Sequence, residues 1–137
     1  MLSNLASVYL KKERFAEATA LYEKALSALG DKYKVRSSTI YNNLGNIYAE
    51  TNDNPKAIEY FTTAYEGLKQ ILGSDHPNAL KVLVNLAEVR QSESPGSDST
   101  KFFMDTLDRL RKVLGSEHPL VKNMLKKNKK MQPNKRT

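Results

Sequence analysis

The sequence predicts an all-α fold: an α-α superhelix, or solenoid, of about three helix-turn-helix pairs closed by one short terminal helix. Two observations predict it, a 42-residue period and apolar residues that recur at helical spacing within each period. The 137 residues suit a single domain, and no apolar run approaches the roughly 20 residues that a membrane-spanning helix needs. A soluble repeat protein is therefore expected.

The period is visible in a loop and in a helix. The segment Leu72–Pro77 (LGSDHP) recurs 42 residues later as Leu114–Pro119 (LGSEHP), and Leu44-Gly45 recurs at the same interval as Leu86-Ala87. The first unit is shorter, because Leu5-Ala6 precedes Leu44-Gly45 by 39 residues. We expect repeats at about residues 1–33, 34–75 and 76–117, a terminal helix at 118–127 and a basic, disordered tail at 128–137.

Each of the first two repeats contains two amphipathic helices. In the first repeat the two helices carry the apolar and small residues Leu5, Ala6, Tyr9, Ala18, Tyr22 and Ala25. In the second repeat two helical stripes are complete: Ile40, Tyr41, Leu44, Ile47 and Tyr48, then Ala57, Phe61, Ala64, Tyr65 and Leu68. Asn54 is expected to cap the second of these helices, with Pro55 in its first turn.

The third repeat departs from this pattern. Arg90 stands where the second repeat has Tyr48. Ser99 and Thr106 stand where it has Ala57 and Ala64, and the segment Ser94–Ser97 loosens the turn between the two helices. Its second helix is therefore expected to pack less regularly. After it, Leu120, Val121, Met124 and Leu125 form a short apolar stripe, which is typical of the capping helix that repeat arrays require.

The motif Leu-Gly/Ala-x-x-Tyr, followed by Ala-x-x-x-Phe/Tyr-x-x-Ala, resembles tetratricopeptide repeats. The 42-residue period and the segment His76–Ala87 (HPNALKVLVNLA) are similar to the repeats of kinesin light chains and of nephrocystin-like proteins. The resemblance implies a non-catalytic adaptor or scaffold. It also implies that the first helices of successive pairs line a concave groove that holds a peptide or helix of another protein.

An asparagine stands before the core leucine in each of the three first helices, as Asn4, Asn43 and Asn85. A row of side-chain amides suits a peptide backbone because each offers a donor and an acceptor. The alternative is that these asparagines bond the neighbouring helix and stabilise the stack. With the positions that the family resemblance adds, the candidate groove residues are Asn4, Ser7, Lys11, Asn42, Asn43, Asn46, Lys81, Asn85 and Glu88.

One family binding mode can be compared directly with the sequence. The carboxylate clamp of some tetratricopeptide domains uses Lys, Asn, Asn, Lys and Arg to hold acidic chaperone tails. The matching positions here are Ser3, Ser7, Asn43, Lys81 and Asn85. Only Asn43 and Lys81 fit, so the charge-assisted bonds to carboxylates would be lost and such tails are not the expected ligand.

The sequence offers little that could carry catalysis. It has no cysteine, which excludes thiolate metal sites and thiol nucleophiles, and no glycine-rich phosphate loop. His76 and His118 occupy the same place in the repeated loop, so a structural role at the start of the next helix is favoured over metal binding or acid-base chemistry. No catalytic residue, metal or cofactor is expected.

The net charge of +7 comes from the end of the chain. Residues 1–119 hold 15 basic and 15 acidic residues, and no acidic residue follows Pro119. The candidate basic tail comprises Lys126, Lys127, Lys129, Lys130, Lys135 and Arg136. Such a tail could bind a polyanion such as RNA or an anionic membrane. It lacks the interleaved aromatics that single-strand binding favours, so nucleic acid is not the expected partner, and a solvated end is the alternative.

The first residues leave the assembly state open. No signal-peptide pattern is present, which makes the cytoplasm the default compartment. A helix that begins near Met1 would expose Leu2, Val8 and Leu10. Either further repeats or another subunit, including a second copy of the chain, could cover this face. A structural subunit of a larger assembly is therefore the alternative to a peptide-binding adaptor.

Overall fold

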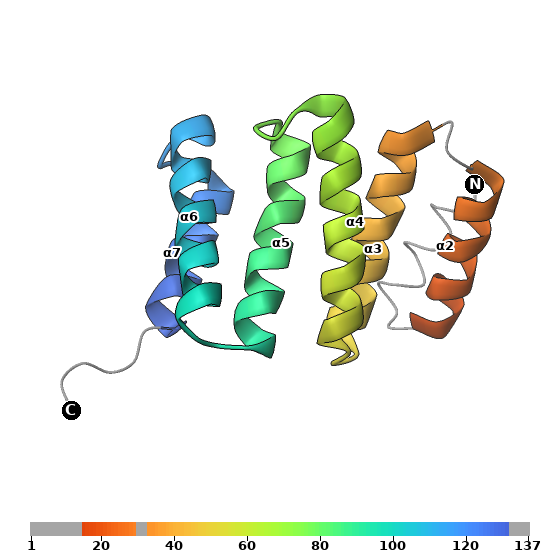
Figure 1. Cartoon of the computed structure of the whole chain (residues 1–137), viewed down its shortest axis with the longest axis horizontal. Helices are drawn as coiled ribbons and strands as arrows, with labels where there is room; N and C mark the ends of the chain where they lie inside the picture. The colour runs from red at the N-terminus through yellow and green to blue at the C-terminus, as the bar shows by residue number, and fades with distance from the viewer. Residues whose placement is uncertain (1–14, 30–32, 132–137) are drawn as a thin grey trace.

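Six helices make up the part of the chain that the computed structural model describes, residues 15–29 and 33–131 without the side chains of 129–131. They are α2 (Phe15–Leu29), α3 (Lys34–Glu50), α4 (Asn54–Leu72), α5 (Pro77–Glu93), α6 (Ser97–Leu114) and α7 (Pro119–Met131). The helices stand in one row in chain order, from α2 at one end to α6 and α7 at the other (Figure 1). Each packs on its neighbour in sequence, and the predicted all-α solenoid is confirmed.

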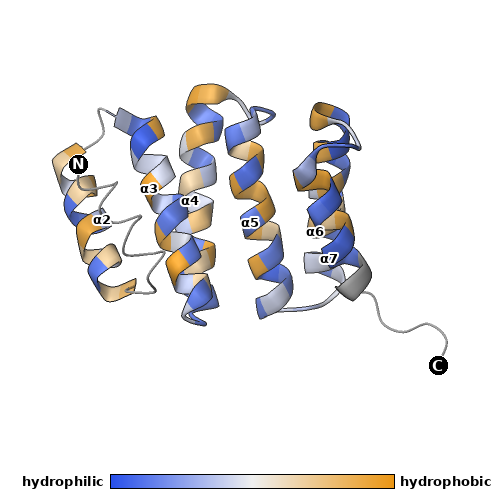
Figure 2. Ribbon diagram, turned by 180° about the vertical axis from the view of Figure 1, so that it is seen from behind, coloured by the Kyte–Doolittle hydropathy of each residue, from blue (hydrophilic) through white to orange (hydrophobic). Residues whose placement is uncertain are grey.

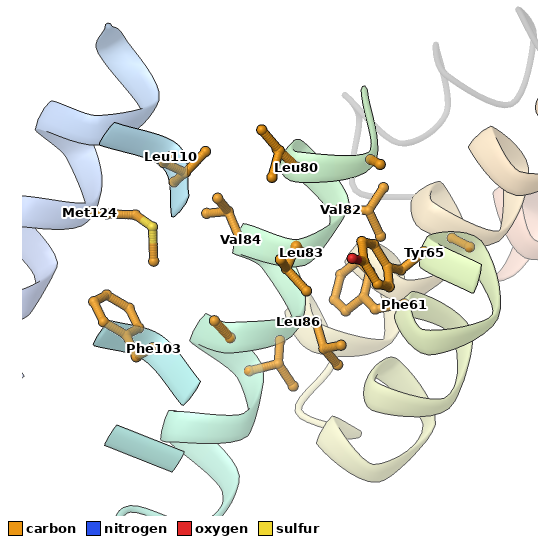
Figure 3. Packing of buried hydrophobic residues seen from close by; sticks show 14 of the residues in the cluster. Phe61, Tyr65, Leu80, Val82, Leu83, Val84, Leu86, Phe103, Leu110 and Met124 are labelled. Carbon is orange, nitrogen blue, oxygen red and sulfur yellow. The ribbon is translucent and has the colours of Figure 1, made fainter. Parts of the chain in front are cut away.

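The helices bury two clusters of side chains. One cluster joins α2 to α3 through Ala18, Tyr22, Ala25, Ile40, Leu44 and Ile47, and a larger one runs from α4 through α7. Within the larger cluster, Phe61 of α4 points toward α5, and Met124 of α7 points toward Phe103 of α6 (Figure 3). Tyr41 of α3 packs against both clusters, so the core continues along the whole row.

Polar residues alternate with these buried ones around each helix. Figure 2 shows that each helix carries both hydrophobic and hydrophilic residues along its length. Such an amphipathic helix must bury one stripe against a neighbour, and a row of helices does so pair by pair. None of the helices in residues 15–29 and 33–131 is both long enough and apolar enough to cross a membrane.

Gly45 allows α3 and α4 to cross at close range. A Cβ atom at this position would lie 2.6 Å from the ring of Phe61, which is only 1% exposed. In the third repeat Ala87 and Phe103 hold the equivalent places. There α6 packs on α5 less extensively than α4 packs on α3, in line with the less regular packing expected of the third repeat.

Two buried hydroxyls in α6 stand where the other repeats have alanine. The Ser99 hydroxyl donates to the carbonyl oxygen of Ser94 at 2.6 Å, and the Thr106 hydroxyl donates to the carbonyl of Phe102 at 2.8 Å. Both side chains are buried. Bonding to backbone carbonyls is what makes these polar substitutions tolerable inside the core, because an unbonded hydroxyl there would lose its hydration without compensation.

Two helix ends differ from the predicted ones. The N-cap of α4 is Asp53, whose carboxylate accepts from the amide of Lys56, and Asn54 is already the first helical residue. The prediction that Asn54 caps this helix was therefore wrong by one position. At the other end, α7 continues to Met131, so residues 128–131 of the predicted tail have a helical backbone.

We expect the substitution Gly45→Ala to destabilise the fold. The added methyl group would meet the buried Phe61 ring, and overpacking of this kind costs about 1–3 kcal/mol. The better helix propensity of alanine offsets about 1 kcal/mol of that cost. Urea denaturation followed by circular dichroism should show a net loss of up to about 2 kcal/mol.

The control is a double-mutant cycle with Phe61→Leu. In a chain that already carries Phe61→Leu, the same Gly45→Ala change should cost less, because the smaller leucine side chain can move away from the new methyl group. An equal cost in both backgrounds would show that the Phe61 ring is not what requires glycine at this position.

Candidate functional site

The candidate groove residues lie on the first helices of successive pairs, α3 and α5, which also contact each other directly. We call the surface formed by α3, α5 and α7 the first-helix face. Asn42, Asn43, Asn46, Asn85 and Glu88 are half-buried there, and Lys81 is exposed. The remaining candidates, Asn4, Ser7 and Lys11, and the apolar residues of the predicted amino-terminal face lie outside the described residues.

A side-chain hydrogen bond joins α3 to α5 on this face. The amide nitrogen Nδ2 of Asn85 donates to Oδ1 of Asn42 at 3.0 Å, and the pair is part-buried. The structure therefore pairs Asn85 with Asn42, and not with Asn43, which occupies the equivalent place one repeat earlier. Part of the amide row is used to hold neighbouring helices together, as the stack-stabilising alternative predicted.

A second polar link joins α5 to α7. The ammonium of Lys127 lies 2.9 Å from Oε2 of Glu88, with the two side chains 54% and 22% exposed. Lys127 stands 42 residues after Asn85, so the two residues hold equivalent places in α7 and α5. Each of them bonds to the preceding first helix, which makes this repeat position a recurrent link along the first-helix face.

Only part of the predicted basic tail lies on a helix that the structure describes. Lys126 and Lys127 lie on α7 and are exposed, and Lys122 of the same helix pairs with Glu117 at 3.1 Å. Lys129 and Lys130 belong to the helical backbone of α7, and Lys135 and Arg136 lie outside the described residues. Two of the three described lysines of α7 are thus paired with carboxylates.

Three tyrosines stack along α3 and α4. The Tyr60 ring lies 5.4 Å from that of Tyr48 and 5.9 Å from that of Tyr41, measured between ring centres. The ammonium of Lys56 lies over Tyr48 at 5.2 Å. Burial, assisted by Tyr48 and by the nearby Glu23, raises the pKa of the Tyr60 hydroxyl above 10.0. The Tyr60 hydroxyl therefore keeps its proton at neutral pH, and the three stacked rings contribute packing.

Both histidines cap helices. Nδ1 of His76 accepts from the amide of Asn78, and Nδ1 of His118 accepts from the amide of Leu120, each at 3.1 Å. Pro77 and Pro119 begin the following helices, as predicted. The glycines of the same loops, Gly73 and Gly115, adopt φ of 96° and 89°, which favours glycine. In residues 15–29 and 33–131 no group of three metal-ligating side chains comes together.

An arginine bridge that the sequence analysis did not single out joins the second helices α4 and α6. Arg109 donates to the hydroxyl of Tyr65 at 3.1 Å, and its Nε lies 3.6 Å from Oδ1 of Asp75. The acidic residues around it are ion-paired and exposed, for example Asp105 with Lys101 at 3.1 Å. A comparison of repeat-equivalent positions is the signal that could have found Arg109, because the second repeat has Gly67 there.

Comparisons with known proteins match this architecture. A family model described as tetratricopeptide repeat matches residues 1–70 and 36–95. The N-terminal domain of stress-induced protein-1 (STI-1) from C. elegans has a similar structure, with a TM-score of 0.70 and 20% identity over 96% of this chain and 92% of that chain. No curated protein sequence matches the chain.

A second solved structure, of a longer protein, is also similar to this chain. BtubC (BKLC) from P. vanneervenii has a TM-score of 0.64 and 18% identity over 97% of this chain. The chain spans 65% of the length of that protein. At identities of 18% and 20%, the two likenesses bear on the fold alone.

Loss of the histidine cap should weaken the fold. In His76→Ala the amide of Asn78 loses its acceptor, and we expect the free energy of unfolding to fall by about 1 kcal/mol in thermal or urea denaturation. His118→Ala should act in the same direction. His76→Asn is the control, because asparagine is a strong N-cap residue. An Asn variant as unstable as the Ala variant would contradict a capping role.

Proposed function

The chain belongs to the tetratricopeptide repeat family, and we propose that it is a non-catalytic adaptor that holds a peptide or helix of a partner protein on its first-helix face. Tetratricopeptide repeats form protein interaction modules. The finer assignment, that the partner lies on this face, is supported above all by the Asn42–Asn85 pair. The kinesin-light-chain subtype stays a prediction.

The Asn42–Asn85 pair has hydrogen-bonding capacity to spare. After Asn85 Nδ2 has donated to Asn42 Oδ1, the pair retains the amide hydrogens of Asn42 and the carbonyl oxygen of Asn85. A donor and an acceptor held close together match the alternating carbonyl and amide groups of a peptide backbone. Each such bond adds about 0.5–1.5 kcal/mol net, so a few of them with apolar contacts support moderate affinity.

The face is already ordered before a partner arrives. Asn42 and Asn85 are fixed by their mutual bond, and Glu88 by its pair with Lys127. Side chains that are held in place lose less conformational entropy on binding than free ones do. Around them, Asn43 and Asn46 add further half-buried amides, and Lys81 supplies an exposed cation. A polar, extended segment with mixed charge fits this surface better than an apolar helix does.

Fewer observations support the two alternative functions, polyanion binding and assembly into a larger complex. Binding of a polyanion through α7 is weakened by the pairing of Lys122 with Glu117 and of Lys127 with Glu88, which lowers the free positive charge of this helix. Assembly through the amino-terminal face depends on residues outside the described part of the chain. The first-helix face is therefore the surface that we assign to the partner.

Site-specific photo-crosslinking tests the assignment. A benzoylphenylalanine at Asn46, on the first-helix face, should crosslink to a partner in cell extract, whereas one at the exposed Asp105 of α6 should not. Crosslinks that form mainly from Asp105 would place the partner on the second helices and contradict the proposal.

A double substitution then tests the amide pair. Asn42→Ala with Asn85→Ala should weaken partner capture about tenfold or more, since donor and acceptor are both lost. The fold should lose only about 1 kcal/mol, the value of one hydrogen bond. Circular dichroism melts provide this control. Unchanged capture with a large loss of stability would show that the pair only holds the helices together.

A further inference from the structure

A cavity lies where α2, α3 and α4 meet, and its described lining includes none of the candidate groove residues. Its volume is about 760 Å³, and it is lined by Leu26 of α2, by the N-terminal half of α3 and by the C-terminal half of α4. Cavities of a few hundred to about 1,000 Å³ are the usual size of sites that bind small molecules. Neither the family nor the proposed function assigns a role to this cavity.

The cavity is encoded by residue choices that distinguish two equivalent junctions. The junction of α4, α5 and α6 has large side chains at three positions, and the junction of α2, α3 and α4 has smaller ones at the equivalent positions. The large residues are Tyr65, Leu80 and Arg109, and their respective equivalents, 39 or 42 residues earlier, are Leu26, Ser38 and Gly67.

The two junctions differ in their packing accordingly. Leu80 is completely buried, and Arg109 extends to the hydroxyl of Tyr65. All three of their smaller equivalents line the cavity. The cavity therefore lies at a junction where three positions carry smaller side chains than their equivalents one repeat later.

Ser38 gives the cavity a polar floor. Its side chain is only 2% exposed, and its hydroxyl points toward Gly67, on which a Cβ atom would collide with it. This hydroxyl can donate one hydrogen bond to a ligand that enters the cavity.

Among the described residues, the rim of the cavity has more positive than negative charge. Lys34 and Lys69 stand there with one carboxylate, that of Glu66. The ammonium of Lys34 donates to the neutral amide of Gln70 at 3.4 Å, and that of Lys69 lies 6.0 Å from the centre of the Tyr65 ring. Within residues 15–29 and 33–131, neither ammonium is paired with a carboxylate.

We propose that this cavity binds a ligand through an oxyanion, a phosphate or a carboxylate group, held by Lys34, Lys69 and the hydroxyl of Ser38. The two ammonium groups supply charge-assisted bonds at the rim, and the hydroxyl donates from the floor. Tyr41 and Leu26 form an apolar wall for the rest of the ligand. The described lining includes none of the candidate groove residues, so a ligand in the cavity leaves those residues available to a partner protein.

Titration by ¹H–¹⁵N NMR tests the proposal and identifies the oxyanion. Sodium phosphate and sodium acetate are added separately, with sodium chloride at equal ionic strength as the reference. Saturable shifts confined to residues 34–41 and 62–70, with either salt or both, would support the site, and the salt that acts identifies the group. Shifts that follow ionic strength alone, or that also appear at the equivalent residues 76–83 and 104–112, would overturn it.

Two substitutions of Ser38 separate binding from packing. Ser38→Leu installs the residue of the third repeat, and its larger side chain should abolish the shifts. Ser38→Ala removes only the hydroxyl and should weaken binding about tenfold with the melting temperature unchanged.

Substitutions at Lys69 and at its repeat equivalent Arg111 complete the test. Lys69→Ala should weaken binding, whereas Arg111→Ala, the equivalent change in α6 beside a filled junction, should leave it unchanged. Binding that survives Ser38→Leu, or that falls equally in Lys69→Ala and Arg111→Ala, would overturn the proposal.

Discussion

The close crossing of α3 and α4 at Gly45 is the constraint on which the rest of the structure depends. Because position 45 has no side chain, the Phe61 ring lies directly against the backbone of α3. Phe61 also belongs to the cluster that extends through α5 to α7, so the depth to which this ring is inserted sets the position of α5 relative to α3. That position in turn brings Asn85 within 3.0 Å of Asn42. A steric choice in the core thus determines the polar geometry of the candidate binding face.

Much of this could be predicted from the sequence because it depends on periodicity. The helix pairs, the small residues at the crossings and the caps at His76 and His118 all recur at a fixed interval, and a recurrent pattern identifies its own structural role. The pairing of Asn85 with Asn42 could not be predicted in the same way. Equivalent residues of successive helices need not face each other, because each repeat is displaced and rotated relative to the one before it. The partner of Asn85 therefore lies one residue before the position that the period indicates.

Features that break the period were harder to predict. The N-cap at Asp53 and the continuation of α7 to Met131 depend on local competition between neighbouring polar residues, which moves a helix end by one or a few positions without changing the pattern. The cavity is lined at three separate positions by side chains smaller than their equivalents one repeat later, and small residues leave no motif. Only when the third repeat is used as a reference for the second do Ser38 and Gly67 become informative. Differences between repeats, as well as their likeness, therefore help to locate candidate sites in this chain.

The same comparison explains the character of α7. Its residues Val121 and Met124 are completely buried against the preceding helices, as a first helix requires. Its exposed Lys122 and Lys126, however, stand at the positions where α5 has the buried residues Leu80 and Val84. Ammonium groups are costly to bury, so this side of α7 favours water over the apolar surface of another helix. Lys127, on the other side, is paired with Glu88 and holds α7 to the first-helix face. One short helix thus covers the core on one side, extends the candidate binding face on another and presents a solvated surface on the third.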